Sequence, residues 1–202
     1  TSIDLSPASD LCRDRSRYVL GRATCALALF AALMASTTPS PLYPIYLDRW
    51  NLGQSVGTAI FATYALGTLM ALFLAGALNQ RVNDRRKILL PALAVTALGA
   101  ILFAIADGVI LLFIGRLFSG ISTGLITGTA SAAIYDLSPD RHKSRAAMIS
   151  TVAFTAGAAT GPCIAASAVA LDLAPLVLPF VIIAAIAALA ALGLTGAEWP
   201  KT

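Results

Sequence analysis

The chain has 202 residues, of which 58% are hydrophobic and 12% are charged, and its mean hydropathy is +0.82. Soluble domains carry about 25% charged residues, so this composition excludes an ordinary soluble protein and indicates an integral membrane protein. The net charge of +4 could suggest a nucleic-acid partner, but the placement of the basic residues favours a membrane topology and no nucleic acid.

Six continuous apolar runs are long enough to cross a lipid bilayer as helices, since about 20 apolar residues span its hydrocarbon core. They are rich in Ala, Leu and Gly and do not alternate with polar residues, which argues against a β-barrel. The sequence therefore predicts an all-α integral membrane protein with six transmembrane helices at residues 22–42, 55–78, 88–106, 109–134, 146–170 and 174–195.

The basic residues lie almost entirely on one side of these spans. Twelve of the 14 Lys and Arg fall in the terminal segments, at the start of the first span, or in the loops after the second and fourth spans. Because loops rich in Lys and Arg stay in the cytoplasm, we expect both termini to be cytoplasmic and the protein to lie in the plasma (inner) membrane. Residues 1–21 and 196–202 would then be cytoplasmic tails around a six-helix bundle at 22–195, with no cleaved signal peptide. Three scattered cysteines have no metal or redox spacing, so neither a metal nor a cofactor is expected.

The first span changes character after Met34, where hydroxyl residues and prolines follow. Pro39, Pro41 and Pro44 cannot continue regular helical hydrogen bonds, so the outer end is expected to be kinked or unwound. Two interpretations stay open: an irregular helix end with an aromatic belt, or an outer gate beside a solute path. The hydroxyl residues concerned are Ser36, Thr37, Thr38 and Ser40, and the aromatic belt would be Tyr43, Tyr46 and Trp50.

Arg116 is the only charge inside the fourth span. A guanidinium within a membrane helix costs roughly 2.5–3.5 kcal/mol on insertion scales and cannot shed its proton. Arg116 is therefore expected to face protein or a water-filled cavity, as a functional residue. It shares one helical face with Ser119, Thr123 and Thr127, and this polar face suggests a cavity lining. Hydroxyl groups bonded to their own helix are the alternative for these Ser and Thr residues.

Small residues mark helix contacts in the fourth and fifth spans. Spacings of four residues let helices approach closely, and a proline next to a glycine marks a bend that a neighbour must support. Tyr64 and Thr68 give the second span a modest polar face, whereas the third and sixth spans are expected to be structural and lipid-facing. The contact residues are Gly120, Gly124 and Gly128 in the fourth span, and Gly157, Gly161 and Pro162 in the fifth.

Three motifs at these positions resemble those of the major facilitator superfamily of transporters. Residues 76–87 resemble its cytoplasmic loop motif G-x-L-x-D-R-x-G-R-R/K, and residues 116–124 resemble R-x-x-q-G-x-g-x-g, whose arginine is linked with proton coupling. Residues 157–162 resemble the core of its antiporter motif. The loop-motif residues are Gly76, Gln80, Arg81, Asp84, Arg85 and Arg86.

The sequence departs from this pattern at several positions. Gln80 stands where the loop motif has Asp, which puts the family's lock between the two halves in doubt unless Asp84 takes that role. Asp136, at the cytoplasmic end of the fourth span, is expected to pair with Arg85 or Arg86. In the fifth span, Ala165 and Ala166 replace the closing glycine pair, which dilutes the antiporter signal.

The resemblance covers about residues 20–195 and implies the amino-terminal half of the family's fold, a 3+3 inverted repeat. It implies alternating access of a small solute with a second six-helix half, driven by a proton gradient. Efflux is favoured, and a solute uptake symporter or a truncated non-transporting membrane protein are the alternatives. The implied proton-coupling and substrate-cavity residues are Arg116, Ser119, Thr123, Thr127, Thr38 and Tyr64.

The predicted spans contain no acidic residue, so the counter-ion of Arg116 would come from the substrate or the second half. This also disfavours a cationic-drug exporter.

An enzyme is the rival class, because Ser122 lies in a G-x-S-x-G pattern that could suggest an intramembrane serine protease. That pattern acts at a strand-to-helix turn, and the single histidine, His142, is expected in a cytoplasmic loop. We therefore expect no enzyme activity.

Overall fold

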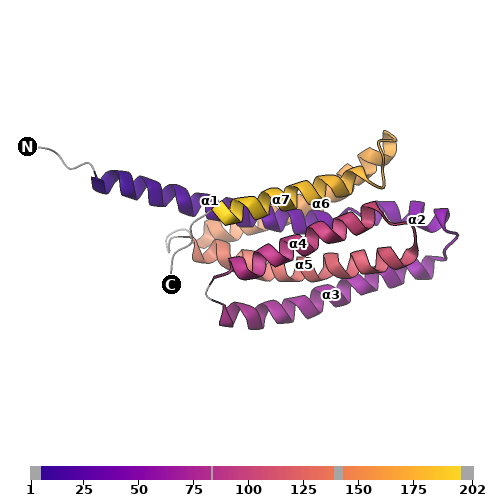
Figure 1. Cartoon of the computed structure of the whole chain (residues 1–202), viewed down its shortest axis with the longest axis horizontal. Helices are drawn as coiled ribbons and strands as arrows, with labels where there is room; N and C mark the ends of the chain where they lie inside the picture. The colour runs from indigo at the N-terminus through magenta and orange to yellow at the C-terminus, as the bar shows by residue number, and fades with distance from the viewer. Residues whose placement is uncertain (1–5, 83, 139–142, 197–202) are drawn as a thin grey trace, which may run out of the picture.

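The computed structural model describes residues 6–82, 84–138 and 143–196, with side chains described from Tyr18 onward. Within these residues every regular element is a helix and no strand occurs (Figure 1), which confirms the predicted fold class. The elements are α1 (Ser6–Thr37), η1 (Ser40–Leu42), α2 (Tyr43–Arg49), α3 (Gln54–Arg81), α4 (Arg86–Ala104), α5 (Val109–Asp136), α6 (Lys143–Ala170) and α7 (Leu178–Gly196).

Among the described residues, six helical segments are long and apolar enough to cross a membrane, as the sequence predicts. The first is the continuous path of α1, η1 and α2, and the others are α3 to α7. α1 begins at Ser6, within the segment predicted as a tail, while residues 197–202 of the predicted carboxy-terminal tail lie outside the described residues. α7 begins at Leu178, after the predicted start at 174, because Ala174 has a positive φ of 42° and a turn precedes the helix.

The proline-rich outer end of the first span is broken as expected. α1 ends at Thr37, and the short 3-10 helix η1 separates it from α2. The Thr38 amide still donates to the Met34 carbonyl (3.0 Å), but the next turn is closed by the Leu42 amide on the Pro39 carbonyl (3.1 Å). Proline removes an amide donor and clashes with the preceding turn, so the helix axis is interrupted here.

α1 and α5 form the middle of the bundle. α5 packs against α3, α4 and α1, while α6 lies along α1, and α7 lies along α4 and α1 (Figure 1). In the most apolar stretch, half of the residues of α5 are buried, against 22% for α3 and 22% for α6. The most lipid-accessible helices are therefore α3 and α6.

The third span was predicted to be structural and lipid-facing, and α4 lies between α5 and α7 with 44% of its most apolar stretch buried, while Leu98 and Ile101 remain exposed. Its small residues allow this packing, since Gly99 lies against the backbone of α5 at Gly115 and Ser119. For α7 the buried share is 33%, so one face is lipid-accessible as expected.

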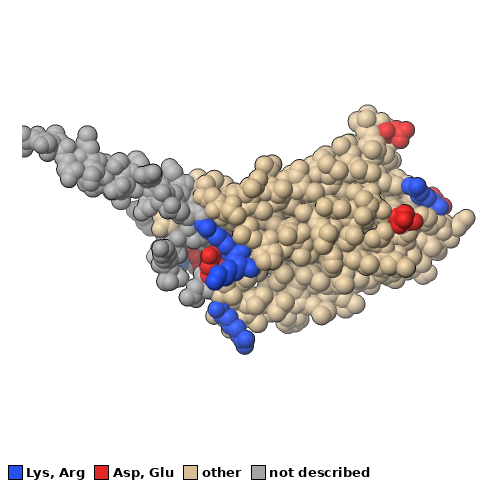
Figure 2. All heavy atoms as spheres, in the orientation of Figure 1, with Lys and Arg blue, Asp and Glu red and all other residues tan. Residues whose placement is uncertain are grey.

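Charged side chains gather at the two ends of the bundle and leave a wide uncharged band between them (Figure 2). At one end lie the basic residues around the α3–α4 connection, and at the other lie Asp48, Arg49, Asp107 and Asp172. This uncharged band suits a hydrocarbon layer, since charged side chains are costly within it.

Candidate functional site: a caged arginine

Arg116 lies in the second turn of α5, close to the α4–α5 connection, and its side chain is fully buried at 0% exposure. It is the largest fully buried side chain among the described residues. A charge in this position requires polar partners, because an unpaired buried ion pays several kcal/mol of desolvation.

The broken end of α1 supplies these partners. Arg116 Nη1 donates to the Ser36 carbonyl (2.7 Å), one of the last carbonyls of α1, which lack a partner within the helix. Arg116 Nε donates to the Tyr43 hydroxyl at the start of α2. Nη2 is buried and has no partner among the described residues. Two neutral acceptors thus hold the guanidinium.

Three aromatic rings surround the same guanidinium and form what we call the aromatic cage. Its carbon lies 4.9 Å from the ring centroid of Tyr43, 5.4 Å from that of Tyr64 and 5.9 Å from that of Phe103. Each ring face attracts a cation, by about 2 kcal/mol when water is excluded. The Ser36 hydroxyl donates to the Tyr64 hydroxyl (2.6 Å) and ties α3 to the same end of α1.

The remaining polar face of α5 packs against α1. The Ser119 hydroxyl lies 3.4 Å from the Ala35 carbonyl, and the Thr123 hydroxyl lies 3.3 Å from the Ala32 carbonyl. These hydroxyls bond to a neighbouring helix and not within their own, whereas Thr38 does bond back, to Met34 (2.6 Å). The Thr127 hydroxyl has no partner among the described residues.

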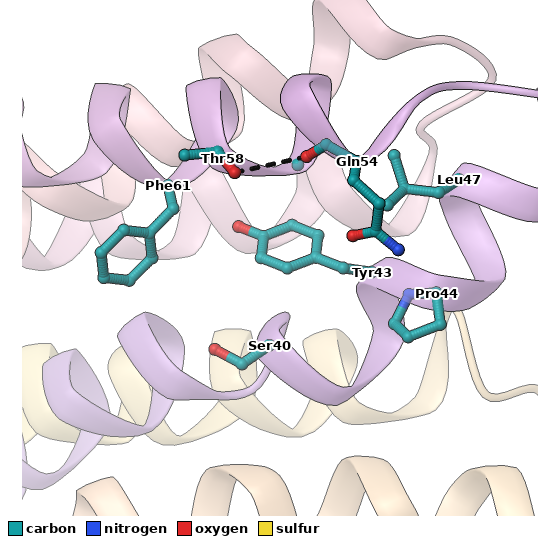
Figure 3. A pocket seen from close by; sticks show the side chains of 8 residues that line it. Ser40, Tyr43, Pro44, Leu47, Gln54, Thr58 and Phe61 are labelled. Atoms are coloured by element: carbon teal, nitrogen blue, oxygen red, sulfur yellow. Dashed lines mark hydrogen bonds between the residues drawn. The ribbon is translucent and has the colours of Figure 1, made fainter.

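A cavity of about 450 Å³ lies beside the cage, between η1, α2 and the first turns of α3, and we refer to it as the outer cavity after the predicted topology. The Tyr43 ring crosses this cavity between α3 on one side and η1 on the other (Figure 3). The lining is uncharged and mixes hydroxyl and amide groups with apolar side chains. It consists of Ser40, Tyr43, Pro44, Leu47, Gln54, Gly57, Thr58 and Phe61.

The glycines of α5 lie where α3 crosses it. A Cβ at Gly124 would come within 2.5 Å of the Thr68 carbonyl, and one at Gly120 would collide with the Tyr64 carbonyl. At Gly128 the nearest atom is the Ala75 Cβ, at 3.2 Å. This close approach brings Tyr64 to Arg116.

The glycines of α6 lie against α1. A Cβ at Gly157 would collide with the Phe30 carbonyl, and one at Gly161 would come within 2.5 Å of the Thr37 hydroxyl. Pro162 follows inside the same continuous helix. The fifth-span motif therefore lies along the helix that ends at Ser36 and Thr37.

The residues of the predicted loop motif form a separate cluster around the α3–α4 connection, at the opposite end of the bundle. Arg85 donates through Nε (3.0 Å) and Nη2 (2.6 Å) to the same carboxylate oxygen of Asp136, so Arg85 is the partner that pairs with it. Asp84 accepts from the Arg86 amide (3.0 Å) and shapes the start of α4. Gln80 and Arg81 are exposed, and nothing lies within 4 Å of a Cβ at Gly76.

Ser122 does not lie at the strand-to-helix turn that the serine-protease alternative requires. Ser122 is buried inside the continuous helix α5 and donates to the Ser119 carbonyl (3.1 Å), while His142 lies outside the described residues. No group of three His, Cys, Asp or Glu that could hold a metal occurs in the described part of the chain.

Sequence reasoning named Tyr43 only under the aromatic-belt interpretation, with an outer gate as the open alternative, and did not single out Phe103. Tyr43 was within reach, because it lies between Pro41 and Pro44 in the segment predicted to unwind. Phe103 carried no sequence signal, since an aromatic residue in an apolar span is usually a packing residue.

Of the comparisons with known proteins, the one with family models agrees with a six-helix membrane bundle. A search of curated proteins finds no match for the chain. The family model of the Major Facilitator Superfamily matches residues 25–199, which is most of the chain; the match begins within the first span and covers the other five. The chain therefore belongs to the Major Facilitator Superfamily.

Proposed function

We propose that this chain is half of a secondary active transporter that exports a small solute, coupled to protons, by alternating access. Membership of a transporter family supports a membrane transporter. The observation that carries the mechanism is Arg116: a buried cation, held by neutral groups, with no acidic partner among the described residues. Such a charge responds to any carboxylate or anion that comes within reach.

The direct test replaces Arg116 with Ala in the transporter paired with its second half. We expect coupled transport in proteoliposomes to be lost while membrane insertion is kept, because the charge that links solute and proton is gone. Arg49→Ala is the matched control, since Arg49 is an exposed arginine at the outer rim. Proton coupling that persists in Arg116→Ala would contradict the role assigned to Arg116.

The second six-helix half is also a proposal. α3 and α6 expose large apolar side chains such as Phe73 (81%), Met70 (71%) and Met148 (63%), and Gly76 lies open beside them. We propose that part of this surface packs against the second half, encoded in the same frame or in another chain. Solute counterflow in vesicles that hold this chain alone, compared with vesicles that hold both halves, tests the requirement.

Efflux is supported by the fifth-span motif, whose glycines lie against the end of α1 near the aromatic cage. We propose that α6 bends at Pro162 as this end of α1 moves, since proline weakens a helix locally. Inside-out vesicles should accumulate solute when acidified inside, and accumulation in right-side-out vesicles alone would favour the uptake alternative.

We also place the α3–α4 connection on the cytoplasmic side of the plasma membrane, because basic loops stay there.

A further inference from the structure

Arg85 and Arg116 use the same edge of the guanidinium in different ways. Arg85 directs Nε and Nη2 together at the carboxylate of Asp136, at 3.0 and 2.6 Å. In Arg116, Nε meets the Tyr43 hydroxyl and Nη2 has no partner among the described residues. The two N–H groups on this edge match the spacing of two oxyanion oxygens. On this edge of Arg116, Nε therefore has a neutral partner, and Nη2 has none among the described residues.

The group that fills it also forms a wall of the outer cavity. Tyr43 directs its hydroxyl to Arg116 and presents its ring to the cavity of about 450 Å³ (Figure 3). It belongs to the seven-residue helix α2, which the break at η1 separates from α1. The Tyr43 side chain therefore stands between the cavity and the open edge of the guanidinium.

We propose that the Nε–Nη2 edge of Arg116 is an oxyanion site that receives a carboxylate from the outer cavity when the Tyr43 hydroxyl is displaced. A carboxylate would fill both nitrogens and neutralise a buried charge, which two neutral acceptors do not. Binding of a carboxylate here deepens the proposed transport function. Only the passage of the anion across the membrane rests on that function. Binding itself requires no transport.

The cavity lining also defines the rest of the ligand. Pro44, Leu47 and Phe61 offer apolar contact, while Ser40, Gln54 and Thr58 carry neutral polar groups. Cavities of this mixed kind bind a ligand with an apolar body and few polar groups. The occupant is therefore a carboxylate that carries a small apolar body.

The test measures binding of sodium benzoate to the full chain in phosphatidylcholine nanodiscs by calorimetry, with benzyl alcohol as the neutral probe. Tyr43→Phe removes only the competing hydroxyl and should tighten benzoate binding roughly 2- to 10-fold, the value of one hydrogen bond. Tyr46→Phe is the matched control, because its hydroxyl donates to the Phe103 carbonyl (3.3 Å) and not to Arg116. Arg116→Lys keeps the charge but lacks the two-nitrogen edge, and should weaken binding roughly tenfold or more.

Lipid phosphate offers the same oxyanion chemistry, so the titration is repeated in phosphatidylglycerol nanodiscs. Unchanged affinity identifies a free solute as the occupant, and competition identifies a headgroup. Absence of benzoate binding in both the wild type and Tyr43→Phe, with native circular dichroism, would overturn the proposal. So would equal binding of benzyl alcohol, or an unchanged affinity in Arg116→Lys. Benzoate binding without any transport would keep this site and contradict the proposed transport function instead.

Discussion

At the scale of single residues, the aromatic cage shows how a membrane protein keeps a charge without a counter-ion. Arg116 is stabilised by one helix-end carbonyl, one phenol hydroxyl and three ring faces. None of these groups carries a formal negative charge, so each partly offsets desolvation and leaves the positive charge in place. A cation stabilised in this way is still attractive to an anion.

Tyr64 contributes to the cage in two separable ways, as an acceptor for Ser36 and as a ring facing Arg116. Tyr64→Phe keeps the ring, so we expect unfolding free energy to fall by about 1 kcal/mol. Tyr64→Leu also removes the ring face and should lose about 1–2 kcal/mol more. Titration with SDS in mixed micelles, followed by circular dichroism, measures both.

Phe73→Leu is the control for this pair, since Phe73 lies on the same helix but is 81% exposed. It should change stability by less than about 0.5 kcal/mol. Equal losses in Tyr64→Phe and Tyr64→Leu would show that the ring face does not stabilise Arg116.

Sequence reasoning at this scale found the charge and named Tyr64 with it, but it did not find the other groups that hold the guanidinium. The free-energy cost of a guanidinium within a membrane helix made Arg116 prominent from the sequence alone. Its partner Ser36 acts through a backbone carbonyl, which every residue has, so no residue type marks it. Tyr43 and Phe103 reach the guanidinium only because α2 and α4 lie beside Arg116 in the folded bundle, which is a tertiary effect.

At the scale of elements, the contact between α3 and α5 depends on glycine. Gly120 and Gly124 let the two backbones come so close that a Cβ would strike the carbonyls of Tyr64 and Thr68. Without a hydrophobic force between helices in lipid, such close packing is a main source of association. The four-residue spacing predicted a close helix contact on this face of α5, because it fixes which residues share a face, but it did not identify α3 as the neighbour.

Gly124→Ala should therefore separate α3 from α5 and lower unfolding free energy by about 1–3 kcal/mol, the usual effect of overpacking. Gly76→Ala is the matched control on α3, because nothing lies within 4 Å of its Cβ. It should be neutral or slightly stabilising, since alanine favours a helix more than glycine does. Thermal unfolding in detergent compares the two; equal melting temperatures would contradict the packing described.

The break in the first span was also predictable, because three prolines have a local and strong effect. What followed the break was not. The short helix η1 and the contact of α2 with α3 have no periodic signal in the sequence. The different buried shares of α4 and α6 depend on how the helices assemble. These features come from packing among the helices, which composition does not encode.

At the scale of the whole molecule, the uneven charge distribution gives the bundle a direction. Cysteine at position 80 or 107, placed in a chain freed of its own cysteines, reports that direction, because Gln80 and Asp107 are exposed at opposite ends. We expect an impermeant maleimide to label Asp107→Cys in intact cells and Gln80→Cys only after permeabilisation. The reverse pattern would place both termini outside.

The position of Arg116 also has an electrical consequence. A membrane potential does about 2.3 kcal/mol of work on one charge that crosses the whole bilayer at 100 mV. Movement of Arg116 by one helical turn, about 5.4 Å of a ~30 Å layer, would thus be favoured or opposed by roughly 0.4 kcal/mol. A carboxylate bound at its open edge would cancel that charge. The empty site would then feel the voltage, whereas the loaded site would move as an electrically silent pair.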